Sequence, residues 1–184
     1  RGRFRQFMQC DIDILGEPSN LAETELVLAT TTLLSKLDFK NFRVKMNDRR
    51  ILKAMALYAG FPEDGTDNVF IILDKMDKIG FDGVKEELIE NGYDEKAVEK
   101  YMSLFEKMNA SDDALMFLKE ALADTLEDGV VENLKEIFAT VNEAKVADCE
   151  LKFDPTLVRG MGYYTGTIFE IAIPEFGGSC GGGG

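Results

Sequence analysis

The chain changes character twice along its length, and this division limits its fold more than any other feature of the sequence. Residues 65–145 read as successive short amphipathic helices, with turn signals such as Asn91-Gly92 and Asp128-Gly129 between them. The segments on either side contain stretches rich in aromatic and β-branched residues, which are typical of strands. We therefore expect an α+β fold in which an all-helical insertion interrupts a β-sheet core.

The same pattern sets the expected boundaries. Strands are predicted at residues 4–15, 42–46, 149–153 and 163–174. Helices are predicted at residues 21–37, 49–59, 69–79, 83–91, 95–108, 112–123 and 130–144, with Gly60 ending the second of them. We place the first part of the core at residues 1–60, a helical insertion domain at 61–146, and the second part of the core at 147–184.

Charge follows this division. Of the formal net charge of −13, residues 61–150 carry −15, whereas residues 1–60 carry +3 and residues 151–184 carry −1. Contact with nucleic acid favours Lys and Arg, because neutralisation of phosphates dominates affinity. Lys96, Lys100 and Lys107 follow helical spacing and form a candidate basic face within the acidic segment. A solvated acidic helical domain explains the composition equally well.

Residue counts exclude several kinds of site. The chain has no histidine, so it can hold neither a Ser-His-Asp or Cys-His nucleophile system nor a histidine-ligated metal. Its three cysteines, Cys10, Cys149 and Cys180, are too few and too scattered for a cysteine-only zinc site, and no metal ligands are predicted. Their odd number also argues against a secreted disulfide framework and favours a cytoplasmic setting. No apolar run approaches the roughly 20 residues that span a bilayer, so no membrane partner is expected.

The first predicted strand has two unlike faces. Side chains alternate along a strand, so Phe4, Met8, Ile12 and their neighbours form an apolar face. The opposite face runs Arg3, Arg5, Phe7, Gln9, Asp11, Asp13. Guanidinium groups suit a phosphate, a ring can stack on a base, and an amide and carboxylates suit an amine. The pattern alone favours a half-exposed antiparallel strand, and the order of groups also suits a nucleotide beside an amine.

Three strings in order carry a family resemblance. GRFRQFMQCDIDILGE (residues 2–17), with its R-x-x-x-F spacing, resembles motif 2 of class II aminoacyl-tRNA synthetases and closely resembles that stretch in the histidyl-tRNA synthetase family. LVRGMGYYTGTIFEI (residues 157–171) resembles the histidine-specific signature of that family, and GGSCGGGG (residues 177–184) resembles its glycine-rich strand before motif 3. FRVKMNDRRIL (residues 42–52) lies between them. The resemblance implies an incomplete antiparallel β-sheet core of class II type with a helical insertion domain.

The resemblance also implies roles on the ATP side of a site. Arg3 matches the arginine that reaches the terminal phosphates of ATP, and Phe7 matches the ring that stacks on adenine. Arg159 matches the catalytic arginine of histidyl enzymes, near the α-phosphate and the substrate carboxylate. Taken singly, Phe7 also suits strand packing and Arg159 also suits a surface charge.

On the amino-acid side, the resemblance implies that Gln9 binds the backbone groups of the substrate histidine and that Asp13 reads its imidazole ring. Tyr163 and Tyr164 match the pair that lines the histidine pocket. The glycine run at 177–184 would let the backbone approach the ligand closely. Taken singly, Asp13 suits a turn before Gly16, and the two adjacent tyrosines point to opposite faces of a regular strand.

The implied activity is ATP-dependent activation of L-histidine and its transfer to tRNA(His), with Mg²⁺ accompanying ATP and a homodimer expected for the full-length protein. Carboxylate attack on an α-phosphate needs fixed cations and no general base, so a chain without histidine can perform it. The chain starts without methionine and ends on glycines, and we expect both ends to cut through a larger protein. Motif 1, the first motif 2 arginine and the motif 3 arginine are absent, so the chain alone is expected to be inactive.

Two related readings stay open. The regulatory subunit of ATP phosphoribosyltransferase is a non-catalytic relative with the same core, and a synthetase-like sensing domain of a stress kinase is a binding module. Retention of Arg3, Phe7, Gln9, Asp13 and Arg159 favours the synthetase over both.

Overall fold

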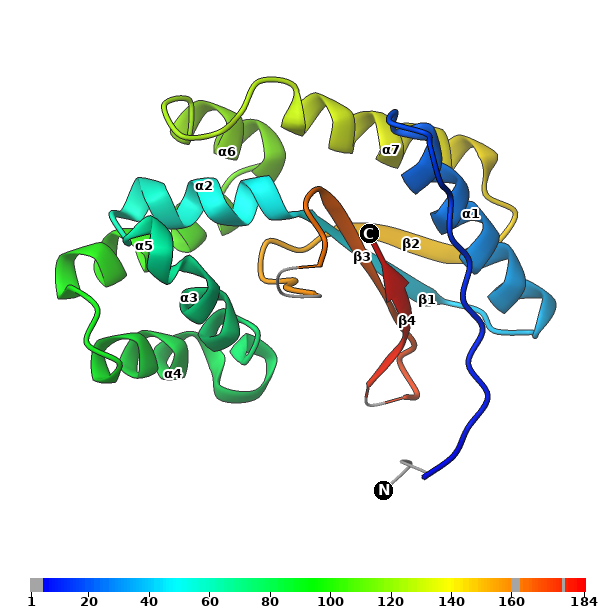
Figure 1. Cartoon of the computed structure of the whole chain (residues 1–184), viewed down its shortest axis with the longest axis horizontal. Helices are drawn as coiled ribbons and strands as arrows, with labels where there is room; N and C mark the ends of the chain where they lie inside the picture. The colour runs from blue at the N-terminus through cyan, green and yellow to red at the C-terminus, as the bar shows by residue number, and fades with distance from the viewer. Residues whose placement is uncertain (1–4, 160–162, 177) are drawn as a thin grey trace.

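A four-stranded sheet forms the centre of the chain (Figure 1). The computed structural model describes residues 5–159, 163–176 and 178–184. The strands are β1 (Phe42–Asp48), β2 (Cys149–Phe153), β3 (Thr167–Ala172) and β4 (Ser179–Gly183), in the spatial order β2-β1-β3-β4. The β1–β3 and β3–β4 pairs are antiparallel, as expected, whereas β1 and β2 are parallel. The sheet is therefore mixed, because the chain returns to β2 in the direction of β1 through a long crossover.

Seven α-helices and one short 3₁₀ turn surround this sheet in the described residues. They are α1 (Leu21–Lys36), α2 (Arg49–Ala59), η1 (Glu63–Gly65), α3 (Thr66–Leu73), α4 (Met76–Glu90), α5 (Glu95–Asn109), α6 (Ala114–Ala121) and α7 (Val130–Ala144). Figure 1 shows α3, α4 and α5 grouped on the side of the molecule away from α1. None of the helices in the described ranges is long and apolar enough to cross a membrane.

The helix predictions are confirmed closely for α2 and α7, and one of them is wrong. Gly60 ends α2 with a φ of 99°, the left-handed conformation that a C-terminal glycine adopts without strain. The single helix predicted at residues 69–79 is divided in two, because α3 ends at Leu73 and α4 starts at Met76. Gly80, with a φ of 71°, then bends α4 at the predicted turn. The division brings Asp74 and Asp77 towards the sheet.

The predicted strand at residues 4–15 is also wrong for its described part. Residues 5–15 adopt no helix or strand, and their side chains are mostly exposed. Alternation of apolar and polar side chains indicates which face a strand would bury. A strand also needs a neighbouring strand to pair with its backbone N–H and C=O groups. The strands of the sheet pair with one another, and the described part of this segment pairs with none of them.

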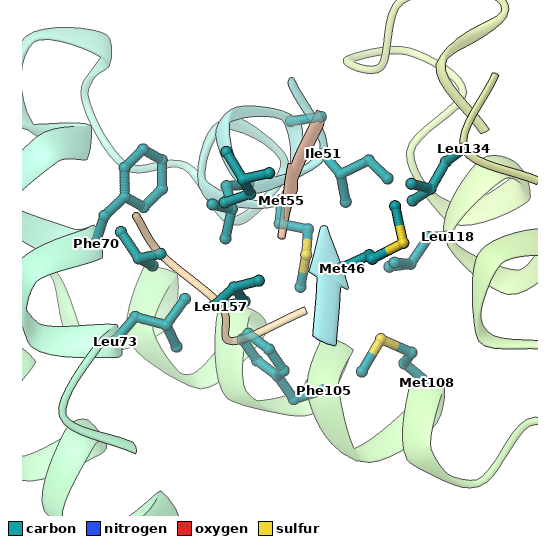
Figure 2. Close-up of a cluster of buried hydrophobic side chains, with 14 of the residues drawn as sticks. Met46, Ile51, Met55, Phe70, Leu73, Phe105, Met108, Leu118, Leu134 and Leu157 are labelled. Atoms are coloured by element: carbon teal, nitrogen blue, oxygen red, sulfur yellow. The ribbon is translucent and has the colours of Figure 1, made fainter. Parts of the chain in front are cut away.

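One hydrophobic core joins the sheet to the helical segment. Met46 on β1 and Met55 on α2 belong to the same buried cluster as Phe105 on α5 and Leu118 on α6 (Figure 2). The same cluster includes Leu134 on α7 (Figure 2), and α7 contacts both α1 and β1. The last predicted helix of the insertion therefore packs on the sheet.

Tyr101 places a buried hydroxyl group in this core. Its side chain is fully buried on α5, and its hydroxyl has no hydrogen-bond partner among the described residues. Burial also raises the pKa of this hydroxyl. The ring itself packs edge-on against Phe61 and Phe105, with centroids 5.2 and 5.1 Å away.

We expect Tyr101→Phe to stabilise the chain by about 1 kcal/mol, because the substitution keeps the ring and removes a buried, unpaired hydroxyl. Urea unfolding monitored by circular dichroism measures the change. Tyr93→Phe is the matched control, because the Tyr93 hydroxyl donates to the Gly65 carbonyl at 3.1 Å and its loss is expected to destabilise. A lower free energy of unfolding for Tyr101→Phe would contradict the prediction.

Candidate functional site

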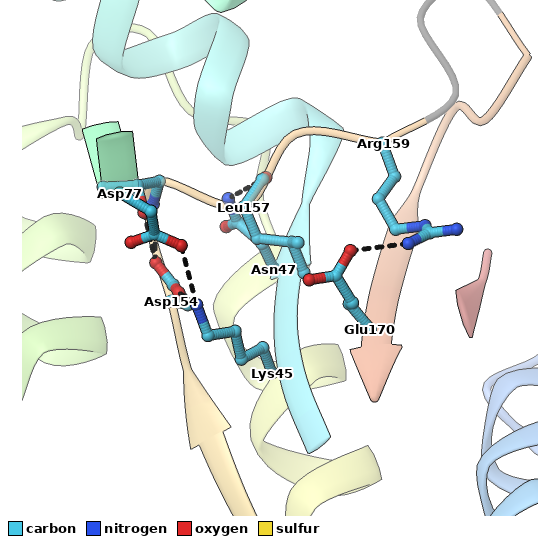
Figure 3. Close-up of polar contacts among 8 residues, drawn as sticks. Lys45, Asn47, Asp77, Asp154, Leu157, Arg159 and Glu170 are labelled. Carbon is cyan, nitrogen blue, oxygen red and sulfur yellow. Dashed lines mark hydrogen bonds and ion pairs between the residues drawn. The ribbon is translucent and has the colours of Figure 1, made fainter. Parts of the chain in front are cut away.

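Arg159 lies at the centre of a polar cluster beside β3 and β4. Its Nη1 atom lies 2.6 Å from Glu170 Oε2 on β3 (Figure 3). The same atom lies 3.1 Å from Ser179 Oγ on β4. The side chains of Arg159 and Glu170 are only about a quarter exposed. The ion pair therefore fixes the direction of a guanidinium group that remains accessible at its edge.

Glycines on β4 and directly after it create the space for this arrangement. A Cβ atom on Gly182 would lie 2.7 Å from Arg159 Cζ and 2.6 Å from the Phe169 carbonyl oxygen. At Gly184 it would lie 2.8 Å from Tyr164 Cδ1. These distances are too short for any side chain, so the glycine run is required for the close approach of Arg159 and Tyr164 to the backbone. The sequence predicts that the glycine run lets a ligand approach the backbone closely. The structure shows that two side chains of the chain itself, Arg159 and Tyr164, also lie close to this backbone.

Tyr163 and Tyr164 contact each other edge-on, with ring centroids 5.1 Å apart and an interplanar angle of 84°. Tyr163 is 78% exposed, whereas Tyr164 is partly buried against the core. The two rings therefore share a contact although they are adjacent in sequence. They lie in the same string as Arg159.

The N-terminal site residues that the structure describes, Phe7, Gln9 and Asp13, are not brought to this cluster. Arg3 lies outside the described residues. Phe7 is 72% exposed, and Asp13 is exposed as well. The amide of Gln9 donates to the Asp11 carboxylate of the same segment, at 2.9 Å from Oδ1. Thus Arg159 and Tyr164 both lie against the glycine run, whereas the described N-terminal residues make none of these contacts.

A second group of charges lies beside Glu170. Lys45 on β1 pairs with Asp154 at 3.0 Å and with Asp77, at the start of α4, at 3.4 Å (Figure 3). Asp154 also accepts hydrogen bonds from Thr156 N at 3.0 Å and Thr156 Oγ1 at 2.6 Å. Together with Asp74 and Glu170, these residues line a small cavity of about 50 Å³. The contacts join the helical segment to the sheet next to Arg159.

The pKa values of two of the four carboxyl groups that line this cavity, Asp154 and Asp74, shift in opposite directions. Burial alone would raise the pKa of Asp154, but hydrogen bonds from Thr156 and Lys45 and the Lys45 charge together hold that pKa below its usual range. Burial, and then the charge of Glu170, raise the pKa of Asp74. Asp154 therefore stabilises the fold as an anion, whereas Asp74 resists ionisation.

Asp154→Asn is expected to lower the free energy of unfolding by about 2 kcal/mol at neutral pH, because a carboxylate with charged and backbone donors is lost. The folded pKa is depressed, so this contribution is present above the unfolded pKa of about 4 and is lost as pH falls through the folded value. Urea unfolding of both proteins from pH 7 to pH 2 measures it. The difference between the two stabilities should begin to shrink near pH 4 and disappear only below the depressed folded pKa, and a constant difference would contradict the assignment.

Sequence reasoning missed the partners of Arg159. Glu170 is the lone charge in the otherwise apolar or neutral strand Thr167–Ala172, and such a charge in a mostly buried strand was the signal for it. Ser179 sits in a glycine-rich string that offered no such contrast. Within the described ranges, no group of three or more His, Cys, Asp or Glu side chains is arranged to hold a metal ion. We therefore assign no residue to Mg²⁺.

Comparisons with known proteins extend over the whole chain. The family model described as histidyl-tRNA synthetase matches residues 1–184. A histidine--tRNA ligase of Leifsonia xyli is 44% identical over 191 residues, which cover 100% of this chain and 43% of the relative. The histidine--tRNA ligase of Flavobacterium johnsoniae is 41% identical over 188 residues, covering 100% of this chain and 39% of the relative. The chain thus spans about two fifths of the length of these relatives.

Solved structures support the same fold. The histidyl-tRNA synthetase of Nostoc sp. PCC 7120 superimposes with a TM-score of 0.71 at 22% identity, over 85% of this chain and 37% of that one. An ATP phosphoribosyltransferase regulatory subunit/histidyl-tRNA synthetase from Bacillus halodurans gives a TM-score of 0.69 at 17% identity, over 89% of this chain and 42% of that one. At such identities the likeness concerns the fold alone.

Proposed function

The chain belongs to the histidyl-tRNA synthetase family, and we propose that it supplies part of the active site for ATP-dependent activation of L-histidine and transfer of histidine to tRNA(His). The observation that carries this proposal is the fixed, accessible guanidinium of Arg159, held by Glu170 and Ser179 over the glycine strand. The family supplies the reaction, and the geometry supports Arg159 as the residue of this chain that acts in it.

In the proposed activation step, the carboxylate of histidine attacks the α-phosphate of ATP and pyrophosphate leaves. Negative charge gathers on the phosphoryl oxygens in the transition state, and a preorganised cation stabilises that charge. Arg159 can present two N–H groups to an oxyanion, because its fork is planar and only one edge contacts Glu170 and Ser179. The nucleophile is already ionised, so no histidine or other base is needed.

We also propose the remaining roles on the basis of the family. Arg3 and Phe7 would bind ATP, while Gln9, Asp13, Tyr163 and Tyr164 would bind L-histidine. Of these, Tyr164 is supported by its seat against Gly184, beside the strand that also seats Arg159. ATP would bring Mg²⁺ with it, and no step is assigned to that ion here. A homodimer and a cytoplasmic location are proposed for the whole protein on the same basis.

The helical segment is proposed to be an insertion domain, with residues 61–146 as its extent. The packing of α7 on α1 and β1 supports a narrower projecting part that ends before Val130. We further propose that this part contacts tRNA, and the exposed side chains of Lys96 and Lys107 on α5 are available to bind its phosphates. Lys100 is engaged instead, with its ammonium 4.0 Å from the centre of the Tyr58 ring.

A chimera tests the proposed function. The 184 residues would replace the matching segment of the Leifsonia xyli histidine--tRNA ligase, which is 44% identical. We expect a folded chimera to catalyse histidine-dependent ATP–pyrophosphate exchange, because it would combine this segment with the remainder of a complete ligase. The separate chain is expected to show no exchange above background. A folded but inactive chimera would contradict the proposed function, and full activity of the separate chain would contradict the proposal that it is inactive alone.

A further inference from the structure

Three consecutive residues at the junction of β1 and α2 hold both ends of the signature segment. Asn47 Nδ2 donates to the Leu157 carbonyl at 3.1 Å (Figure 3). The Arg49 backbone N–H donates to the Gly166 carbonyl at 2.9 Å. One residue further on, Thr167 Oγ1 donates to Asp48 Oδ2 at 3.3 Å. The three residues at this junction therefore contact the signature segment at its first residue and at the point where the segment enters β3.

This junction is itself fixed in position. The side chains of Asn47 and Asp48 are completely buried. Asp48 ends β1, which pairs with β2 on one side and β3 on the other, and it also caps α2 by accepting from Arg50 N at 2.8 Å. The Arg50 side chain adds a two-point contact to the Asp48 carboxylate, at 2.9 and 2.7 Å. A hydrogen bond that starts at this junction therefore ties its partner to the rigid core.

The tied residues lie next to the proposed site. Leu157 precedes Arg159 by two residues, and Gly166 follows Tyr164 by two residues. Holding Leu157 and Gly166 limits the distance over which Arg159 and the tyrosine pair can move. Preorganisation of this kind matters because an active-site group displaced by about 1 Å can lose roughly 10²-fold in rate.

We propose that Asn47, Asp48 and Arg49 are positioning residues for histidine activation, which act by anchoring the two ends of the signature segment. The proposal rests on the proposed function for the catalytic consequence, whereas the anchoring itself is a property of this chain. The two parts can therefore be tested separately.

Hydrogen exchange on the 184-residue chain tests the anchoring. Thr167→Val removes the hydroxyl bond to Asp48 and retains a β-branched side chain in a strand, so folding should be preserved. Asn47→Ala removes the bond to Leu157. We expect about fivefold faster exchange in peptides covering residues 154–168 for each variant, with α5 and α7 unchanged. Thr167→Ser retains the donor and should restore protection.

Thr31→Val is the matched control, because Thr31 is also buried and, among the described residues, its hydroxyl bonds only to carbonyls of its own helix, Val27 at 2.8 Å and Leu28 at 3.2 Å. It should leave exchange at residues 154–168 unchanged. Faster exchange throughout the chain in Thr167→Val and Asn47→Ala, or none at residues 154–168, would overturn the anchoring.

The catalytic part is measured in the active chimera. Thr167→Val should raise KM for histidine about fivefold with KM for ATP unchanged, because Thr167 lies nearer to Tyr164 than to Arg159 in the chain. Thr167→Ser should restore the KM, and Thr31→Val should not affect it. An active chimera whose histidine KM is unchanged in Thr167→Val would refute the positioning role and leave the proposed function standing. An inactive chimera whose segment 154–168 still responds in hydrogen exchange would refute the proposed function and leave the anchoring standing.

Discussion

Arg159→Ala is expected to lower histidine-dependent ATP–pyrophosphate exchange in the chimera by about 10²–10³-fold, mainly through kcat. The guanidinium is held beside the glycine strand by contacts at 2.6 and 3.1 Å, so it is in place before the transition state forms. An interaction that is stronger in the transition state than in the ground state affects kcat more than KM. Steady-state exchange kinetics with histidine and ATP varied separately give both constants.

Two further variants test whether the loss of rate is specific to the guanidinium group of Arg159. Arg159→Lys should recover only a small part of the rate, because an ammonium group cannot provide a planar pair of donors. Arg43→Ala is the matched control: Arg43 also pairs with a glutamate, Glu150 at 2.8 Å, but its side chain is 57% exposed on the far part of β1. It should change the exchange rate less than twofold. An Arg159→Ala chimera that is folded and retains more than a tenth of the parent rate would contradict a catalytic role.

The parts of the fold that could be predicted from sequence are those with local signals. The predicted bounds of α2, α7 and β2 coincide with the observed ones, because periodicity and end residues such as Gly60 are properties of the segment itself. The strand predicted at residues 4–15 failed for a different reason. Strand formation depends on a partner elsewhere in the chain, and alternation of side chains says nothing about that partner.

The same distinction applies to the site. Arg159, Tyr163 and Tyr164 could be proposed as site residues because they stand together in one string, with the glycine run close behind. Their supporting contacts come from Glu170, Ser179 and the β1–α2 junction, which are set by the pairing of β1, β3 and β4. Likewise, the amphipathic pattern of α7 shows that it buries one face, but only the structure shows that α1 and β1 cover it.

Asp48 is where fold and site meet, and its removal should have the largest effect on stability. Its fully buried carboxylate accepts hydrogen bonds from the backbone and side chain of Arg50 and from Thr167. Asp48→Ala would remove the cap of α2 and the partner of a cation at once. Loss of one member of a buried ion pair costs about 3–5 kcal/mol, and Arg50 remains able to reach solvent, which favours the lower end.

We therefore expect Asp48→Ala to lower the free energy of unfolding by about 3 kcal/mol and Tm by about 10 °C. Urea and thermal unfolding measure both. Asp67→Ala is the matched control, because Asp67 contacts the neighbouring Arg49 at 3.5 Å with a side chain that is 69% exposed. An exposed pair contributes about 0–1 kcal/mol, so the control should change stability little. Equal losses of stability in the two variants would mean that the buried contacts of Asp48 stabilise the fold no more than the exposed contact of Asp67 does. A loss confined to Asp48→Ala would show that its buried contacts with Arg50 and Thr167 stabilise the fold.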